Sequence, residues 1–532
     1  MTVAATLQSI RMALGSGMAL LMCSVPGGAQ AQTAPAEVPQ AQAARYPTGL
    51  APIAPDDYDR LPKLGKFRAW LPKRVDLSAL FPVPGNQAPK PDCTAWATTY
   101  SGLGYLRGAA LGHRPLATSE EPSPAYVYNR LRPRGSGCSV PTRIVDALTF
   151  LKSEGTVSLA EFPDTPDTCA EPVQHSLVSA QAAQRLGGWQ AIDREKPGDR
   201  RSPVVIDDIK GALFRGEPVV FAMPALDDFM RLAGPTIYTH ATLESTNLHA
   251  MTLVGYDEDR QAFRLINSWG TTWGDAGYAW ISYDTFRLLV GEAYALQRAD
   301  DMPAHPAADA NLTPRQALDA RIAALPCGVA RLEEKGDHLT LSGFAGSEES
   351  LDALHKAMLA VDAHGKWTMD FHPWPQCEAE QTLATPLGAG GVHLVAQTET
   401  GTARTGDPVV LNAGEKFGFS AETTAARPWL TVIYLQADGS AVTIYRGQPA
   451  PDRHGHRQVG IGTGGTAQVQ FQVGAPYGAE MVIAIGSVDP LFEGDPQSYA
   501  TERQFLSGLR ARLARAVPGS VSSAVLRLRT KE

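Results

Sequence analysis

The spacing of apolar residues changes from a helical to a strand period within the first 300 residues. Two helices are predicted from apolar residues three or four positions apart: Trp96, Tyr100 and Leu103 in the first, and Ile144, Leu148 and Leu151 in the second. Short apolar runs between turns then predict four strands, at 218–223, 250–256, 262–267 and 277–282. The pattern therefore predicts an α+β region in which helices precede strands.

The second half begins with a stretch rich in Ala, Pro, Asp and His at 301–314, which predicts a linker. After it, the pattern predicts helices at 316–325 and 350–361 and a strand at 339–342, followed by strands at 408–411, 429–436, 441–445, 467–473 and 481–487 and a closing helix at 502–515. We therefore divide this half into a small α/β module (315–381) and a β-rich, sandwich-like domain (382–532), and expect few contacts across the linker.

The amino terminus has the pattern of a secretory signal at 1–31. Arg11 is its one charged residue, an apolar run follows, and Ala29-Gln30-Ala31 offers a small-x-small cleavage site. A membrane anchor is less favoured because the run is short and broken by glycines, and a lipoprotein at Cys23 is less favoured because Met22 is bulky. We expect cleavage after Ala31, a secreted or periplasmic protein, and no integral membrane segment in the mature chain.

Composition places the remaining chain among ordinary globular proteins. At 532 residues it is too long for one core, so several domains are expected. The net charge of -8 gives no support for nucleic-acid binding, which calls for a basic surface. Residues 32–60 are rich in Pro, Ala, Gln and Asp and are expected to be extended or disordered.

A cysteine and a histidine far apart in sequence carry the candidate chemistry. Cys93 follows Asp92, a favourable helix N-cap, so a helix N-terminus is expected to lower the pKa of its thiol. His249 opens a predicted strand and can act as general base and acid, while Asn267 can hold the imidazole ring. A thiol, a base and an orienting group are the three parts of a nucleophilic site.

These residues and the run Asn-Ser-Trp-Gly-Thr-Thr-Trp-Gly at 267–274 resemble papain-like cysteine peptidases over about 61–300. The resemblance implies a helical lobe facing a β-barrel-like lobe, peptide or protein substrates, and no cofactor or metal. It also implies roles for further residues. Gln87 would donate to the oxyanion, Trp269 would shield the histidine–asparagine bond, and Trp273 would line the leaving-group side of the cleft. Ser139 and Val140 would bind the substrate backbone, and Leu248 would tune the pH range.

The sequence departs from that family in several places, among them Ser139-Val140, where relatives have a glycine pair, and Leu248, where many relatives have Asp or Asn. Asp92 and Thr94 flank the nucleophile where relatives have Ser and Trp, and a neighbouring carboxylate can raise the pKa of the thiol. Lys90 stands where relatives have a second cysteine. Relatives also carry a long helical propeptide that plugs the cleft, and residues 32–60 leave no room for one.

The cysteine count fits an exported enzyme with a free thiol. Without Cys23 five cysteines are left, and if Cys93 is the nucleophile the other four can form disulfides, which persist in oxidising compartments. Four cysteines allow three pairings. Proximity in sequence favours two of these bonds: Cys138–Cys169 and Cys327–Cys377.

Two other functions are left open by the sequence. One is an envelope scaffold that has kept the fold without activity, and the other is a cell-wall amidase or transpeptidase. The region 382–532 resembles an uncharacterised bacterial accessory domain found beside caspase-like peptidases and kinases, through features such as the 434–439 hairpin. That resemblance implies an envelope protein partner.

Overall fold

The computed structural model describes residues 46–532 except 134, 171–183, 197–198, 200–201, 243–246, 300–311, 337 and 463–470. The expected signal at 1–31, most of the linker and part of the 467–473 strand lie outside the described residues. Within 32–60, the expectation of extended or disordered chain is wrong for α1 (Pro55–Arg60), which forms a short helix. It forms because Tyr58 is fully buried and donates to the Ile192 carbonyl, 2.7 Å away.

The helix that begins at Cys93 is continuous but irregular. It runs through α2 (Cys93–Ala95), the π-helix η3 (Trp96–Leu103) and α3 (Gly104–Leu111). Every residue from Cys93 to Leu106 is buried, so the expected single apolar face is wrong. All of its faces are buried because this helix packs against strands on one side and against other helices on the other.

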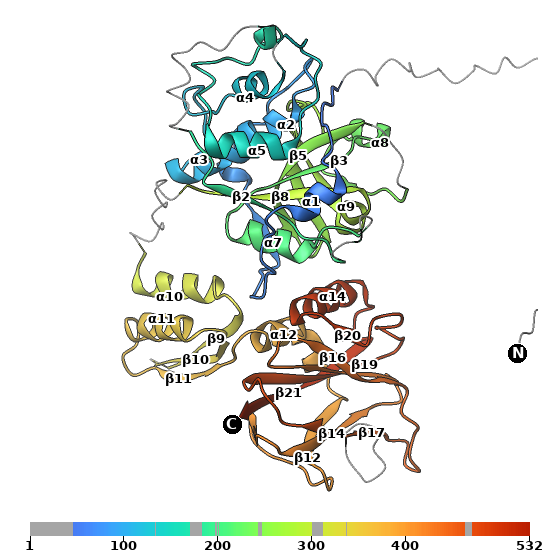
Figure 1. The fold of residues 1–532 in the computed structure, drawn as a ribbon. Coiled ribbons are helices and arrows are strands. Elements are labelled where there is room, and N and C mark those ends of the chain that lie inside the picture. Colours follow the sequence, from blue (N-terminus) through green and yellow to red (C-terminus); the bar gives the residue numbers. More distant parts are fainter. Residues whose placement is uncertain are drawn as a thin grey trace, which may run out of the picture. The chain divides into compact units, whose positions relative to one another are not determined.

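Two further helices complete this lobe. In α4 (Pro124–Leu131), the Ser123 side chain caps the first turn by accepting from the Tyr126 N–H. The predicted second helix is α5 (Ile144–Ser153), and Gly155 follows its end with a left-handed φ of 84°, as expected. In Figure 1 these helices lie beside the strands β3, β5 and β8.

The strands of the first half form one sheet in the order β2-β8-β3-β5-β6-β7-β4, with β1 paired to β5. Their bounds are β1 (Arg74–Asp76), β2 (Gly188–Ala191), β3 (Val219–Pro224), β4 (Ile237–Tyr238), β5 (Leu248–Asp257), β6 (Ala262–Ile266), β7 (Tyr278–Ser282) and β8 (Glu292–Gln297). The four predicted strands are β3, β5, β6 and β7, and β5 extends further towards its amino end than predicted. His249 therefore lies inside β5, opposite Met223 of β3.

Helices α7 (Ile206–Phe214), α8 (Asp227–Met230) and α9 (Tyr283–Leu289) also belong to the first half. Within the described residues, no helix is long and apolar enough to cross a membrane.

The next segment contains helix, strand and helix in the predicted order. It comprises α10 (Pro314–Ala323), β9 (Gly328–Lys335), β10 (His338–Ala345), α11 (Glu348–Leu359) and β11 (Lys366–Phe371). The three strands form one sheet, β11-β10-β9, over a small core that includes Leu318, Leu341 and Met358. The short helices α12 (Gln376–Thr382) and α13 (Ala384–Gly388) follow.

The remaining strands form two sheets that share a core. One sheet contains β12 (His393–Thr398), β14 (Lys416–Thr423), β17 (Arg457–Ile461) and β18 (Phe471–Gln472); the other contains β13 (Val409–Asn412), β15 (Trp429–Leu435), β16 (Ala441–Gly447), β19 (Ala479–Ser487), β20 (Ser498–Tyr499) and β21 (Val521–Lys531). Phe419 of the first sheet and Val432 and Ala484 of the second lie in that core. Helix α14 (Glu502–Arg515) connects β20 to β21.

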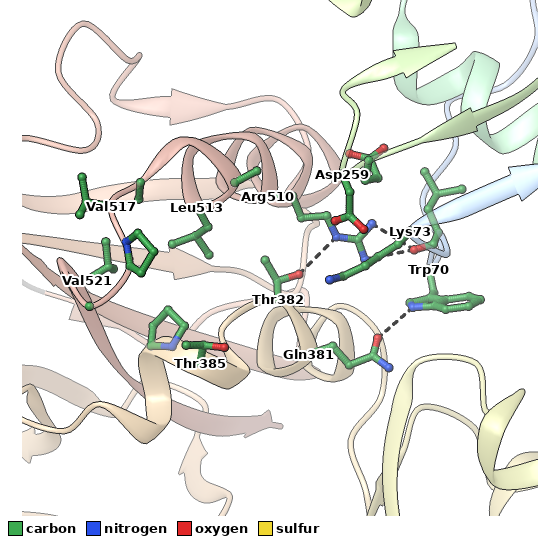
Figure 2. Close-up of a pocket in the computed structure, with 17 residues that line it drawn as sticks. Trp70, Lys73, Asp259, Gln381, Thr382, Thr385, Arg510, Leu513, Val517 and Val521 are labelled. Atoms are coloured by element: carbon green, nitrogen blue, oxygen red, sulfur yellow. Dashed lines mark hydrogen bonds between the residues drawn. The ribbon is translucent and has the colours of Figure 1, made fainter. Parts of the chain in front are cut away.

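Contacts between the two halves are more extensive than the sequence predicts, so the expectation of few contacts is wrong. The Trp70 indole donates to Gln381 at 3.0 Å, and Ser507 of α14 donates to Asp207 at 2.6 Å. Arg510 of α14 donates to the Leu71 carbonyl at 3.1 Å. Figure 2 shows Arg510 beside Trp70, Thr382 and Gln381 at a cavity of about 580 Å³.

The disulfide pairing predicted from the sequence is confirmed. Cys138 is bonded to Cys169 with Cα atoms 5.6 Å apart, and Cys327 is bonded to Cys377 with Cα atoms 5.3 Å apart. Cys93 is a free, buried cysteine.

Candidate active site

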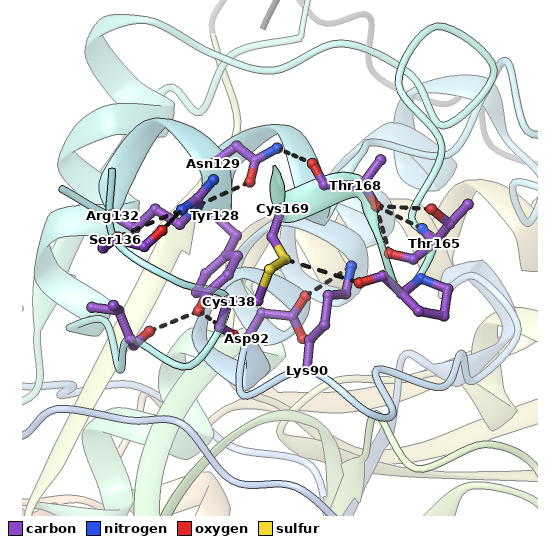
Figure 3. The surroundings of a disulfide bond; sticks show 12 residues. Lys90, Asp92, Tyr128, Asn129, Arg132, Ser136, Cys138, Thr165, Thr168 and Cys169 are labelled. Carbon is purple, nitrogen blue, oxygen red and sulfur yellow. Dashed lines mark hydrogen bonds and ion pairs between the residues drawn. A yellow bond between two sulfur atoms is a disulfide. The ribbon is translucent and has the colours of Figure 1, made fainter. Parts of the chain in front are cut away.

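Cys93 is the first residue of α2 and is fully buried. Asp92 occupies the N-cap position, but its side chain makes no capping bond, contrary to the sequence prediction. The carboxylate instead pairs with the Lys90 ammonium at 3.4 Å (Figure 3). Lys90 also pairs with Asp164. Asp92 therefore occupies the N-cap position, but its carboxylate interacts with Lys90 and does not cap the helix.

The Cys93 thiol is held in its neutral form in this structure. Burial raises its pKa to about 11, and the Asp92 carboxylate adds to the rise. Hydrogen bonding from the backbone of Ala250 and Gly49 offsets part of it. The expectation that the helix N-terminus lowers this pKa is thus wrong here, because the loss of solvation outweighs the helix.

His249 is oriented by Asn267 and covered by Trp269. Its Nε2 lies 2.7 Å from Asn267 Oδ1, and its ring stacks on the Trp269 indole with centroids 4.4 Å apart and planes 18° apart. The other ring nitrogen, Nδ1, is buried and has no hydrogen-bond partner among the described residues. Burial lowers the pKa of His249 to about 4, although the Asn267 bond opposes the shift.

Gln87 is fixed by both ends of its amide. Its Oε1 accepts from the Ser268 hydroxyl at 2.6 Å, and its Nε2 donates to the Lys90 carbonyl at 2.9 Å. The Gln87 and Ser268 backbones are also joined, at 2.9 Å. Because a primary amide has two N–H groups, one N–H of Gln87 is left for another acceptor.

Residues 46–51, called the cover segment below, cross this site. Tyr46 stacks on Trp269 with centroids 4.8 Å apart, and the Trp269 indole donates to the Pro47 carbonyl at 3.2 Å. Farther along, Thr142 N–H donates to the Gly49 carbonyl at 3.1 Å, and Ala51 N–H donates to the Thr142 carbonyl at 3.0 Å. The segment thus runs parallel to the chain at Thr142 and reaches the thiol through Gly49.

Glycine at position 49 is required by close packing. A Cβ there would lie 1.8 Å from the Pro91 carbonyl oxygen, a contact no side chain can make without moving the backbone. The cover segment can therefore approach the start of α2 only because residue 49 lacks a side chain.

The other residues predicted to bind substrate are Trp273, Ser139 and Val140. Trp273 is buried in the β-lobe core, where its indole donates to the Phe229 carbonyl at 3.3 Å and contacts the edge of Trp269. Ser139 is exposed, and the Val140 carbonyl already accepts from Tyr128 at 2.9 Å. The backbone bonds to the cover segment are made by Thr142, and the substrate-binding role of Ser139 and Val140 stays a prediction.

Leu248 and Thr94 were also singled out from the sequence. Leu248 begins β5, half-buried against the core that contains Cys93. Thr94 is buried and donates to the Thr142 carbonyl at 3.0 Å.

Sequence reasoning missed the cover segment, Ser268 and Asp164. Ser268 lies inside the motif that was recognised and could have been found from it. The other two carry no local signal, because their contacts join parts of the chain that are far apart in sequence.

Part of the chain matches a known protein family. Residues 147–293 match the family model described as papain family cysteine protease. This is a papain-family cysteine peptidase region. It includes His249 and Asn267, whereas Cys93 precedes the matched residues.

The papain-family region has curated relatives of the same class. The chain is 35% identical over 231 residues to Peptidase 1 of Euroglyphus maynei, covering 42% of this chain and 64% of that protein. It is 44% identical over 77 residues to Pro-cathepsin H of Medicago truncatula, covering 14% of this chain and 22% of that protein. The chain thus spans less than two thirds of the length of these relatives. They place the papain-family region among the hydrolases.

Solved structures similar to the chain include xylellain, a cysteine protease of Xylella fastidiosa, at 21% identity and a TM-score of 0.38, covering 48% of this chain and 97% of that chain. Another is the bromelain protease of Ananas comosus, at 20% identity and a TM-score of 0.33, covering 43% of this chain and 100% of that chain.

Proposed function

We propose that the protein is an exported cysteine endopeptidase in which Cys93, His249 and Asn267 hydrolyse peptide bonds. The observation that carries the proposal is the 2.7 Å bond between His249 and Asn267 beneath the Trp269 ring. This bond uses Nε2 and leaves Nδ1 as the nitrogen available to a thiol. The strand that carries His249 packs against the helix that begins at Cys93.

In the proposed reaction, the Cys93 proton passes to His249 Nδ1 and the thiolate attacks the peptide carbonyl carbon. The Cys93 backbone N–H and the free N–H of Gln87 would stabilise the oxyanion. The imidazolium returns its proton to the leaving amine, and a thioester forms. Water then attacks the thioester with His249 as base, which releases the carboxylic acid and restores the thiol.

This reaction requires the cover segment to leave the site. With Gly49 against the thiol, burial keeps the pKa of Cys93 near 11 and that of His249 near 4, so both groups stay neutral. Solvent and substrate can reach the pair only when residues 46–51 move. The form described here is therefore a resting form of the proposed enzyme.

The site of action is proposed to be outside the cytoplasm. The apolar amino terminus with Ala29-Gln30-Ala31 supports a signal cleaved after Ala31, and two disulfides support an oxidising compartment. The region 382–532 is proposed to bind an envelope protein partner. Substrates would be exported proteins or peptides.

The proposal is tested by digesting casein and purified peptidoglycan in parallel and labelling the protein with an epoxysuccinyl peptide. We expect casein cleavage, no release of peptidoglycan fragments, and a label that mass spectrometry places on Cys93. Fragments from peptidoglycan alone would identify a cell-wall amidase or transpeptidase. A protein that neither cleaves nor takes the label would be a scaffold, and the proposal would be wrong.

A further inference from the structure

Three charged side chains are buried together beside the nucleophile. Lys90, Asp92 and Asp164 are 4%, 0% and 7% exposed, and the Lys90 ammonium contacts both carboxylates. Asp92 is bonded through the backbone to Cys93. Figure 3 shows Lys90 and Asp92 next to the Cys138–Cys169 disulfide. One cation and two carboxylates carry a net charge of -1 when all three are ionised.

The contacts of Asp92 are too few to balance a buried charge. Neither oxygen makes a full hydrogen bond within the described residues, although the Trp96 indole and the Asp92 backbone N–H lower its pKa in part, and its one ion contact, to Lys90, is shared with Asp164. Its charge raises the pKa values of two other titratable groups, Tyr128 of α4 and Cys93 itself. A carboxylate in such a place has a large effect on its neighbours, because little solvent screens it.

We propose that Asp92 is a positioning residue whose charge state controls the ionisation of Cys93. The inference rests on the proposed peptidase function and adds a regulating group to that site. With Asp92 protonated, Lys90 faces one carboxylate and the group is neutral. When Asp92 loses its proton, a negative charge arises beside the thiol and opposes formation of the thiolate.

The ionisation of Asp92 falls in a range that makes this control effective. Burial raises the pKa of Asp92 to about 7, although Lys90 opposes the shift. The Asp92 carboxylate in turn raises the pKa of Cys93. Above about pH 7 the Asp92 charge therefore makes the Cys93 thiolate harder to form than it would be beside a neutral residue, and below about pH 7 this effect fades.

The test compares Asp92→Asn with the full-length protein by two measurements. The first is kcat/KM on a peptide substrate against pH, where Asp92→Asn should be roughly tenfold more active than the wild type above about pH 7 and close to it below about pH 6. The second is the ultraviolet absorbance of the thiolate against pH, with Cys93→Ala subtracted. Here Asp92→Asn should titrate roughly one pH unit lower than the wild type.

Asp164→Asn is the matched control. It removes the same charge from the same Lys90 partner, but Asp164 is not bonded to Cys93 through the backbone as Asp92 is. We expect a smaller shift in both measurements. Equal shifts in the two variants would overturn the proposal, because net charge alone would then explain them. An Asp92→Asn profile identical to wild type would overturn it as well.

The two measurements separate this proposal from the proposed function. If the wild type cleaves no peptide, the absorbance titration still decides whether Asp92 controls the thiol. If Asp92→Asn does not fold, as judged by circular dichroism, Asp92→Ser is measured in its place. That variant must show the same lower titration of the thiol, and an unchanged titration would reject the role of Asp92.

Discussion

Burial shifts the pKa values of Cys93 and His249 in opposite directions, and both shifts favour the neutral form. The thiol moves to about 11 and the imidazole to about 4. A thiolate–imidazolium pair is thus unfavourable while the site is covered. The residues of the proposed chemistry are in place, and their solvation decides whether they react.

At the same scale, Gln87→Ala should lower kcat by roughly 10²–10³ with little change in KM, because the proposed oxyanion donor is needed only in the transition state. Steady-state kinetics on a peptide substrate measures this. Gln190→Ala is the control, since Gln190 also donates to a backbone carbonyl, that of Lys63, but away from the site. Equal losses in both variants would exclude Gln87 from the oxyanion site.

The principal site residues could be predicted from sequence because each lies in a local motif. Cys93 follows a turn, His249 starts an apolar strand, and Asn267 begins Asn-Ser-Trp-Gly. The pairing of Lys90 with Asp164 could not be predicted in this way. It depends on two loops that meet only in the folded chain.

At the scale of elements, the cover segment is the feature that most affects function. It has no regular structure, yet it stacks on Trp269 through Tyr46 and pairs with Thr142. These six residues lie over the site, in a chain whose sequence leaves no room for the long helical propeptide of its relatives. The backbone conformation of the cover segment depends on Gly49.

Gly49→Ala should therefore expose the site. The added methyl group cannot fit 1.8 Å from the Pro91 oxygen, so the cover segment must shift and Cys93 should react faster with an epoxysuccinyl peptide at neutral pH. Gly65→Ala is the control, because a Cβ at that position meets nothing within 4 Å. If both variants label at the wild-type rate, the cover segment does not limit access to Cys93.

Lowering the pH should also reduce the stability of the cover segment in its position over the site. The pKa of His249 is depressed to about 4 in the covered site, so the stability it contributes is complete above its unperturbed pKa of about 6.5 and is lost as the pH falls towards 4. The raised pKa of Cys93 has the opposite pH dependence. The stability that Cys93 contributes to the covered site is present below about pH 9 and is lost as the pH rises towards 11.

Hydrogen exchange of the Ala51 and Thr142 amides measures this effect. After correction for intrinsic rates, protection should fall by roughly tenfold between about pH 7 and about pH 5. In His249→Ala the difference should disappear. Equal protection at both pH values in the wild type would show that His249 does not couple to the cover.

Element prediction succeeded where the apolar period was strong and failed where packing decides. The strands β3, β5, β6 and β7 follow their apolar runs closely. The long strand β21 was not predicted, although Leu526-Arg527-Leu528-Arg529 alternates as a half-buried strand does. Its partners β13 and β19 are remote in sequence. The π-helical turn of η3 is likewise set by burial on both sides.

For the whole molecule, the contacts made by α14 replace the predicted independence of the two halves. Glu378 of α12 is fully buried and pairs with Arg503 at 2.6 Å and Arg510 at 2.8 Å, both from α14. Arg510 also reaches the Leu71 carbonyl, so the ion group joins the peptidase region to the carboxyl-terminal half.

Glu378→Ala should lower the free energy of unfolding by about 3–5 kcal/mol, because it leaves the buried Arg503 charge without its partner. Urea denaturation followed by tryptophan fluorescence measures the change. Asp352→Ala is the control, since its pair with Lys356 is exposed and should contribute less than about 1 kcal/mol. A Glu378→Ala protein as stable as the control would show that this ion group does not hold the halves together.

The most direct test of the account is hydrolysis of a mixed peptide library by the wild type and by Cys93→Ala after removal of the first 31 residues, under mild reduction. The account predicts cleavage by the wild type and less than about 1% of that rate in Cys93→Ala, because every proposed step begins at this sulfur. Circular dichroism should show the same fold in both proteins. Cleavage of the same bonds by a folded Cys93→Ala protein at a comparable rate would contradict the account.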